Sequence, residues 1–74
     1  MSVYDRKLTQ GLFTLATIIL EDTHLAASAG QSLKKRPAQY KKYAAVLRAA
    51  ARDLDAAAGT IQVVLNRNAR EHHR

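Results

Sequence analysis

A single proline, Pro37, and a glycine seven residues before it, Gly30, divide this chain into two long segments with helical character. The residues between them are mostly polar, which is typical of a loop. Proline suits the first position of a helix because its missing N–H would be unpaired there. Glycine suits the position after the last helical residue because it can take the left-handed conformation. We therefore predict one domain with a helix over about 3–29, a loop over 30–36, a helix over about 37–68 and a basic tail over 69–74.

Both segments carry further helix signals. Ser2 is followed three residues later by Asp5, the spacing of a capping box at a helix N-terminus. The second segment is rich in alanine between residues 44 and 58, and alanine has the highest helix propensity. No strand-like alternation interrupts either segment. The predicted fold class is all-α: a single antiparallel helical hairpin of two long helices that assembles as a dimeric four-helix bundle.

The apolar residues of the second segment recur every three or four positions, which is the spacing of one helix face. Charged side chains, among them Arg48, Arg52 and Asp55, occupy the opposite face. Larger residues alternate with alanine along the apolar line, so we expect the neighbouring helix to approach closely. The residues of this line are Tyr40, Tyr43, Leu47, Ala50, Leu54, Ala57, Ile61 and Val64.

The first segment differs, because its polar residues form one narrow stripe and nearly all other positions are apolar. A single partner helix covers an arc of roughly 100°, so the second helix cannot bury this surface alone. A domain this small hides only about 60% of the surface that its unfolded chain exposes. Without cysteine, no disulfide can add stability. We therefore predict a homodimer or higher homo-oligomer, whose interface contains Leu8, Leu12, Phe13, Leu15, Ile18, Ile19, Leu20 and Leu25.

Basic residues gather near the two ends of the predicted hairpin. The formal net charge is +6 and the sequence pI is about 10.2, which favours acidic partners such as nucleic acid. Lysines at the start of the second helix oppose the helix dipole, so folding alone does not explain them. Interleaved tyrosines could stack on bases. The predicted contacts with nucleic acid or another acidic partner are Lys34, Lys35, Arg36, Tyr40, Lys41, Lys42, Arg67 and Arg70.

A structural interpretation of the same residues stays open. Tyr40 and Tyr43 could be core residues at the end of the bundle with their hydroxyls in water, while the lysines keep the loop soluble. Arg67 and Arg70 lie where the dipole of the second helix favours cations, so they could be stabilising charges alone. Arg6, Lys7 and Arg74 belong to the same end of the hairpin.

Few residues could carry chemistry. Glu21 and His24 have the Glu-x-x-His spacing that di-iron bundles use, but the further glutamates of such sites are missing, so we expect no metal and no other cofactor. There is no Ser-His-Asp or Cys-His set and no glycine-rich phosphate loop. A thin bundle also offers little room for a pocket, so we expect no enzymatic activity.

Two residues break the helical patterns. Asp22 projects towards the apolar side of the first helix, so we expect it to pair with Tyr43, Arg48 or a residue of another subunit. Gly59 lies on the polar face of the second helix, where alanine would be more stable by ~1 kcal/mol. It reflects either neutral drift or the close approach of a partner.

These features leave two function hypotheses. The first is a small non-enzymatic regulator that binds nucleic acid through basic clusters at the bundle ends. The alternative is a protein-binding adaptor or inhibitor that docks an exposed helix face on a larger partner. The apolar run over residues 11–20 is about half the ~20 residues that a transmembrane helix needs. We therefore expect no membrane partner and a cytoplasmic location.

Overall fold

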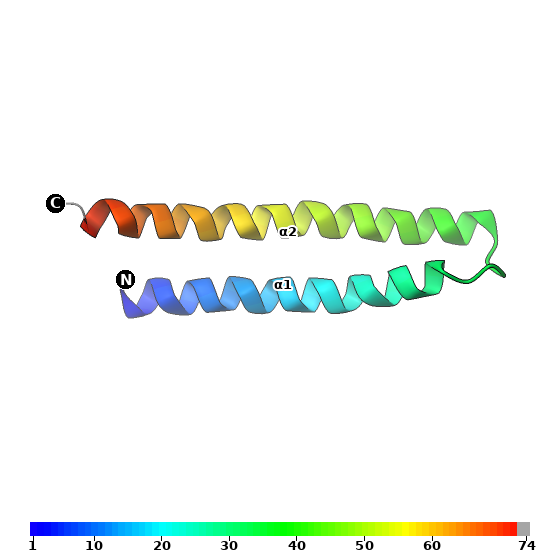
Figure 1. Cartoon of the computed structure of the whole chain (residues 1–74), viewed down its shortest axis with the longest axis horizontal. Helices are drawn as coiled ribbons and strands as arrows, with labels where there is room; N and C mark the ends of the chain where they lie inside the picture. The colour runs from blue at the N-terminus through cyan, green and yellow to red at the C-terminus, as the bar shows by residue number, and fades with distance from the viewer. Residues whose placement is uncertain (73–74) are drawn as a thin grey trace.

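Two antiparallel helices joined by one loop make up the chain (Figure 1). The structure, a computed structural model, describes residues 1–72, with side chains described as far as Arg70. Helix α1 spans Val3–Gly30 and helix α2 spans Pro37–His72, and no strand occurs within residues 1–72. The hairpin is a rod with extents of 60 × 16 × 12 Å. The all-α hairpin predicted from the sequence is therefore confirmed.

The start of each helix follows the expected capping chemistry. The Ser2 side chain accepts a hydrogen bond from the Asp5 N–H at 3.0 Å, which satisfies one of the unpaired donors of α1. Helix α2 begins at Pro37, and the Gln39 side chain accepts a hydrogen bond from the Arg36 N–H at 2.9 Å. This second contact is half of a capping box.

The ends of the helices differ from the prediction. No glycine in the described chain has a positive φ, so the left-handed role predicted for Gly30 is wrong. Gly30 is the last residue of α1, and Gln31 follows in a right-handed conformation with its N–H donating to the Ser28 carbonyl. This tight turn satisfies the last carbonyls without a left-handed residue. Helix α2 continues through the start of the predicted tail to His72, and residues 73–74 lie outside the described residues.

The contact between the helices is a single narrow line of side chains. On α2 the buried apolar residues are Ala50, Ala57, Ile61 and Val64, all of which belong to the predicted apolar line. Leu47 is the exception, because 40% of its surface stays exposed. None of the described large side chains is fully buried. The half-buried residues of α1 that complete the contact are Leu8, Thr9, Leu12, Ala16, Ile19, Thr23 and Ala26.

Most of the apolar surface of α1 stays uncovered. Phe13 is 57% exposed and Leu25 is 69% exposed, and Leu15, Ile18 and Leu20 are exposed as well. The eight residues predicted for an oligomer interface therefore separate into two groups. Leu8, Leu12 and Ile19 are half-buried on the side that faces α2, whereas the other five remain on the surface.

A polar cluster joins the helices where the chain termini meet. The Asp5 carboxylate accepts hydrogen bonds from the Arg67 guanidinium at 2.9 Å and from the Asn68 amide at 3.1 Å. The Asn68 amide also donates to the Val64 carbonyl at 2.8 Å. Asp5 is 8% exposed and Asn68 is 6% exposed, so both groups are largely removed from water. Because these bonds need Asp5 level with Asn68, they fix how far one helix is shifted along the other.

We predict that Asp5→Ala destabilises the hairpin by about 1–3 kcal/mol, because it removes two hydrogen bonds to a charged group and leaves a buried amide with fewer partners. Urea denaturation followed by circular dichroism measures the change. Asp55→Ala is the matched control, since Asp55 is exposed and makes no hydrogen bond or ion pair within the described chain. Equal stability of the two variants would contradict a structural role for the cluster.

We also predict that Gly59→Ala stabilises the protein by about 0.5–1 kcal/mol, because alanine has the higher helix propensity. An added Cβ at Gly59 meets no atom within 4 Å, so no clash offsets this gain. Gly11→Ala is the control in the other helix, because its added Cβ also meets nothing within 4 Å. Denaturant midpoints measure both changes. A loss of stability confined to Gly59→Ala would indicate that another chain packs on this face.

Candidate partner-binding surfaces

One end of the rod carries a concentration of positive charge, which we call the basic tip. It consists of Lys34, Lys35, Arg36, Lys41 and Lys42. All of these side chains are exposed except that of Lys35, which is half-buried. The one ion pair among the described side chains joins Arg67 to Asp5 at the other end of the rod. The positive charge of the basic tip is therefore not neutralised within the described chain.

The tyrosines beside the basic tip hold the loop in place. The Tyr40 hydroxyl donates a hydrogen bond to the Ser32 carbonyl, and the Tyr43 ring lies 3.9 Å from the position of a Cβ added to Gly30. Both rings are half-buried. These contacts support the interpretation of the tyrosines as core residues at this end of the hairpin, except that the Tyr40 hydroxyl binds the Ser32 carbonyl and is not left in water. Leu33 precedes Lys34 in the loop, and it is 97% exposed.

The second predicted cluster has a different character. Arg67 pairs with Asp5 at 2.9 Å, so its charge contributes to the contact between the helices. Arg70 is exposed near the end of α2. Figure 1 shows the loop and the two termini at opposite ends of the rod, whose length is 60 Å. Within one chain the structure therefore does not bring Arg67 and Arg70 together with the basic tip.

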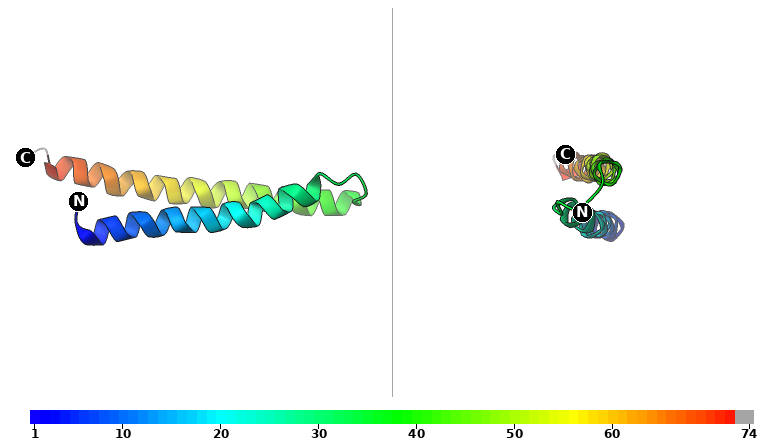
Figure 2. Two further views of the ribbon diagram at one scale, coloured as in Figure 1. Left: turned by 60° about the horizontal axis from the view of Figure 1, so that its bottom comes forward. Right: turned by 90° about the vertical axis from the view of Figure 1, so that its right-hand side faces the viewer.

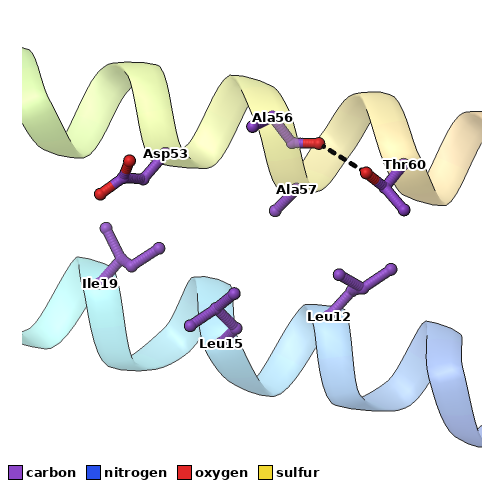
Figure 3. Close-up of a pocket in the computed structure, with 7 residues that line it drawn as sticks. All are labelled: Leu12, Leu15, Ile19, Asp53, Ala56, Ala57 and Thr60. Carbon is purple, nitrogen blue, oxygen red and sulfur yellow. Dashed lines mark hydrogen bonds between the residues drawn. The ribbon is translucent and has the colours of Figure 1, made fainter.

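A shallow apolar groove runs along one side of the contact between the helices. Its largest part has a volume of about 390 Å³ and is shown in Figure 3, where Leu12, Leu15 and Ile19 of α1 face the small residues of α2. An adjoining part of about 240 Å³ shares Ile19 and Asp53 with it. We call this side the Leu15 face. It consists of Leu15 and Asp22 of α1 and Ala49, Asp53, Ala56 and Thr60 of α2.

Two carboxylates border this groove. In Figure 3 the Asp53 side chain projects from α2 towards α1, close to Ile19. Asp22 lines the adjoining part of the groove from α1. Both residues are exposed, and neither has a hydrogen bond or ion pair within the described chain. The expected pairing of Asp22 with Tyr43 or Arg48 is therefore absent, and a partner in another subunit stays a prediction.

On the opposite side of the hairpin, apolar and small side chains lie beside the contact between the helices, and one of them, Ala51, also borders a hollow lined by Arg48 and Arg52. Because an α-helix has 3.6 residues per turn, Phe13 and Leu20 lie on the other side of the Leu12–Ile19 line from Leu15. On α2, the residues across the buried line from Ala49 and Ala56 include Leu47, Ala51, Ala58 and Leu65. We call these six residues the Phe13 face: Phe13, Leu20, Leu47, Ala51, Ala58 and Leu65. All six are exposed.

The remaining sequence candidates do not form a site in the described chain. Glu21 and His24 are exposed, and no three His, Cys, Asp or Glu side chains among the described residues lie close enough to hold a metal ion. The sequence interpretation missed the bonds from Asp5 to Arg67 and Asn68, and also the position of Asp53 beside the groove. Asn68 could have been found, because it continues the three-and-four spacing of Ile61 and Val64.

Comparisons with known proteins add no family to this description. No protein-family model, no curated protein and no solved structure matches the chain. Neither helix within residues 1–72 combines the length and the apolarity that crossing a membrane requires.

Proposed function

We propose that this protein is a small non-enzymatic helical regulator that binds nucleic acid through the basic tip, as a homo-oligomer. The observation that carries the proposal is the basic tip itself, where five cationic side chains gather without an ion-pair partner in the described chain. Like charges at the N-terminal end of α2 also oppose the helix dipole. A cluster that folding disfavours, and that is left without a counter-charge, is the arrangement that binds phosphates.

The oligomer in this proposal is a twofold dimer that forms a four-helix bundle. Its support is the exposed apolar surface of α1, which includes Phe13 and Leu20. In a twofold dimer the same surface of each copy faces its counterpart, so a surface whose charges all have one sign brings like charges into the contact. None of the six residues of the Phe13 face is charged, whereas the Leu15 face carries Asp22 and Asp53. We therefore assign the contact between copies to the Phe13 face.

The dimer doubles the number of phosphate contacts. Each copy adds one basic tip, and Arg70 lies exposed at the opposite end of each rod. Counterion release makes the affinity of such a surface fall steeply with salt, in proportion to the number of phosphates contacted. The half-buried Tyr40 and Tyr43 position the loop in this proposal, and the lysines and Arg36 make the contacts.

A second candidate function is that of a protein-binding adaptor or inhibitor. The observation that favours it is the Leu15 face, whose groove would stay open in a dimer built through the Phe13 face. Ile18 and Leu25 extend the apolar surface beside it, with exposed fractions of 50% and 69%. An exposed apolar surface rimmed by polar residues is typical of protein interaction sites.

We predict that replacing Lys34, Lys41 and Lys42 with Gln weakens nucleic-acid binding without a loss of stability. Fluorescence anisotropy with labelled duplex and single-stranded probes, measured over a salt series, should show the slope of log Kd against log salt fall by about one unit for each lost contact. The melting temperature should stay constant or rise, because the removed charges repel one another at the start of α2.

The control for this variant is Arg67→Gln, which breaks the ion pair with Asp5 but leaves the basic tip intact. It should lower the melting temperature and change the salt slope much less. A wild-type protein that bound neither DNA nor RNA at low salt would contradict the nucleic-acid proposal. Full binding by the lysine variant would contradict the role of the basic tip.

We also predict that Phe13→Asp dissociates or unfolds the dimer, because it places a charge in an apolar contact between copies. Sedimentation equilibrium at micromolar concentration measures the mass, and circular dichroism measures the helix content. Ile18→Asp is the control, since Ile18 lies on the other side of α1 and should leave the dimer intact. A folded wild-type monomer, or dissociation by Ile18→Asp alone, would contradict the assignment of the Phe13 face.

A further inference from the structure

The Leu15 face combines two features that a surface left in water does not require. It is a groove lined by apolar and small side chains, with Leu12, Leu15 and Ile19 on one wall. It also carries Asp22 and Asp53, one from each helix, and neither has a hydrogen bond or ion pair within the described chain. If another chain packed on this groove, it would remove two carboxylates from water. That removal costs free energy unless the packed chain also supplies a cation.

The negative charge of the Leu15 face argues against a second copy of this chain as its partner. Asp22 and Asp53 both line the adjoining part of the groove, so they flank one short stretch of it. Twofold pairing through this face would place both carboxylates of each copy in one apolar contact. Like charges brought together at an interface cost several kcal/mol. This cost disfavours the pairing of two copies through the Leu15 face. The same two residues attract a partner with positive charge.

We propose that the Leu15 face is the docking groove for a cationic amphipathic helix of a partner protein. Apolar side chains of that helix lie against Leu12, Leu15 and Ile19, and one Lys or Arg lies between Asp22 and Asp53. Along α2 the groove extends from Val46 to Thr60, which is about 21 Å at 1.5 Å per residue. A groove of this length holds roughly four turns of a helix.

Small side chains make the groove suitable for a helix. Apart from Val46 and Asp53, its α2 wall consists of alanines and Thr60, and the Thr60 hydroxyl donates a hydrogen bond to the Ala56 carbonyl at 3.0 Å. This bond satisfies the one hydroxyl of the wall within its own helix (Figure 3). A neighbouring backbone can therefore approach α2 closely without leaving that hydroxyl unpaired. Helix-in-groove recognition uses apolar anchors every three or four residues in this way.

This inference deepens the adaptor candidate and does not depend on nucleic-acid binding. The views in Figure 2 show the hairpin as a thin rod with its loop at one end. Asp53 comes eleven residues after Lys42 on α2, which is about 17 Å along the helix at 1.5 Å per residue. Changes at Asp22 and Asp53 should therefore leave nucleic-acid binding at the basic tip unchanged.

The test uses two synthetic helical peptides of about four turns. Both peptides carry leucines every three or four residues on one face. They differ at a single position at the end of that face, where the first peptide has Arg and the second has Glu. Fluorescence anisotropy with the full-length protein should show the arginine peptide binding about tenfold more tightly than the glutamate peptide. The double variant Asp22→Asn, Asp53→Asn should lose this preference while retaining its helix content by circular dichroism.

A control variant distinguishes the effect of these two carboxylates from the effect of the net charge of the protein. Asp55→Asn removes the same charge from the polar face of α2, where Asp55 is exposed, and should keep the full preference for arginine. Rising salt should also weaken the binding of the arginine peptide to the wild type more than that of the glutamate peptide. A double variant that kept the preference would overturn the assignment of Asp22 and Asp53.

The outcomes distinguish this inference from the adaptor function on which it rests. Equal binding of the two peptides would overturn the proposal that the partner is cationic, but the Leu15 face would remain an apolar docking surface. Binding of neither peptide would overturn both. A wild-type tetramer that Leu15→Asp converts to a dimer would show that a second copy covers the Leu15 face, and would overturn the proposal in favour of self-association.

Discussion

A hairpin of two helices can bury only one line of side chains on each helix, and the rest of this structure depends on that limit. The line on α2 runs from Ala50 to Val64, with Leu54 half-buried within it, and its alanines let the helices approach. Helix α1 has more apolar surface than this one contact can cover, with Phe13 and Leu25 mostly in water. The uncovered surface lies on both sides of the contact, so it forms two faces and not one.

Polar contacts at the two ends of the rod fix how the helices align. At the termini, Asp5 binds Arg67 and Asn68, and these bonds require one particular shift of α1 along α2. At the loop, the Tyr40 hydroxyl binds the Ser32 carbonyl. The alanine side chains in the middle of α2 are small, so they restrict the shift between the helices less than large interlocking side chains would. The polar bonds of Asp5, each modest in net energy, favour the alignment that the structure shows.

The sequence predicted what local periodicity determines and missed what depends on two segments together. The line from Ala50 to Val64 and the start of α2 at Pro37 follow from one segment at a time, and both were predicted correctly. The partners of Asp5 and the place of Asp53 beside the groove depend on how far one helix is shifted along the other, which neither segment shows by itself. The prediction for Gly30 was wrong because a turn of right-handed residues also satisfies the end of α1.

In the proposed assembly, charge would give the two apolar faces different partners. If both faces were uncharged, each could pair with itself, and the rod could assemble beyond the dimer. Asp22 and Asp53 make self-pairing unfavourable on one side only, because twofold pairing would bring their negative charges together. In the proposed assembly, self-association would close at the dimer through the Phe13 face, and the Leu15 face would stay open for a partner of opposite charge. The unpaired lysines of the basic tip, at one end of the rod, can act at the same time, because neither face includes them.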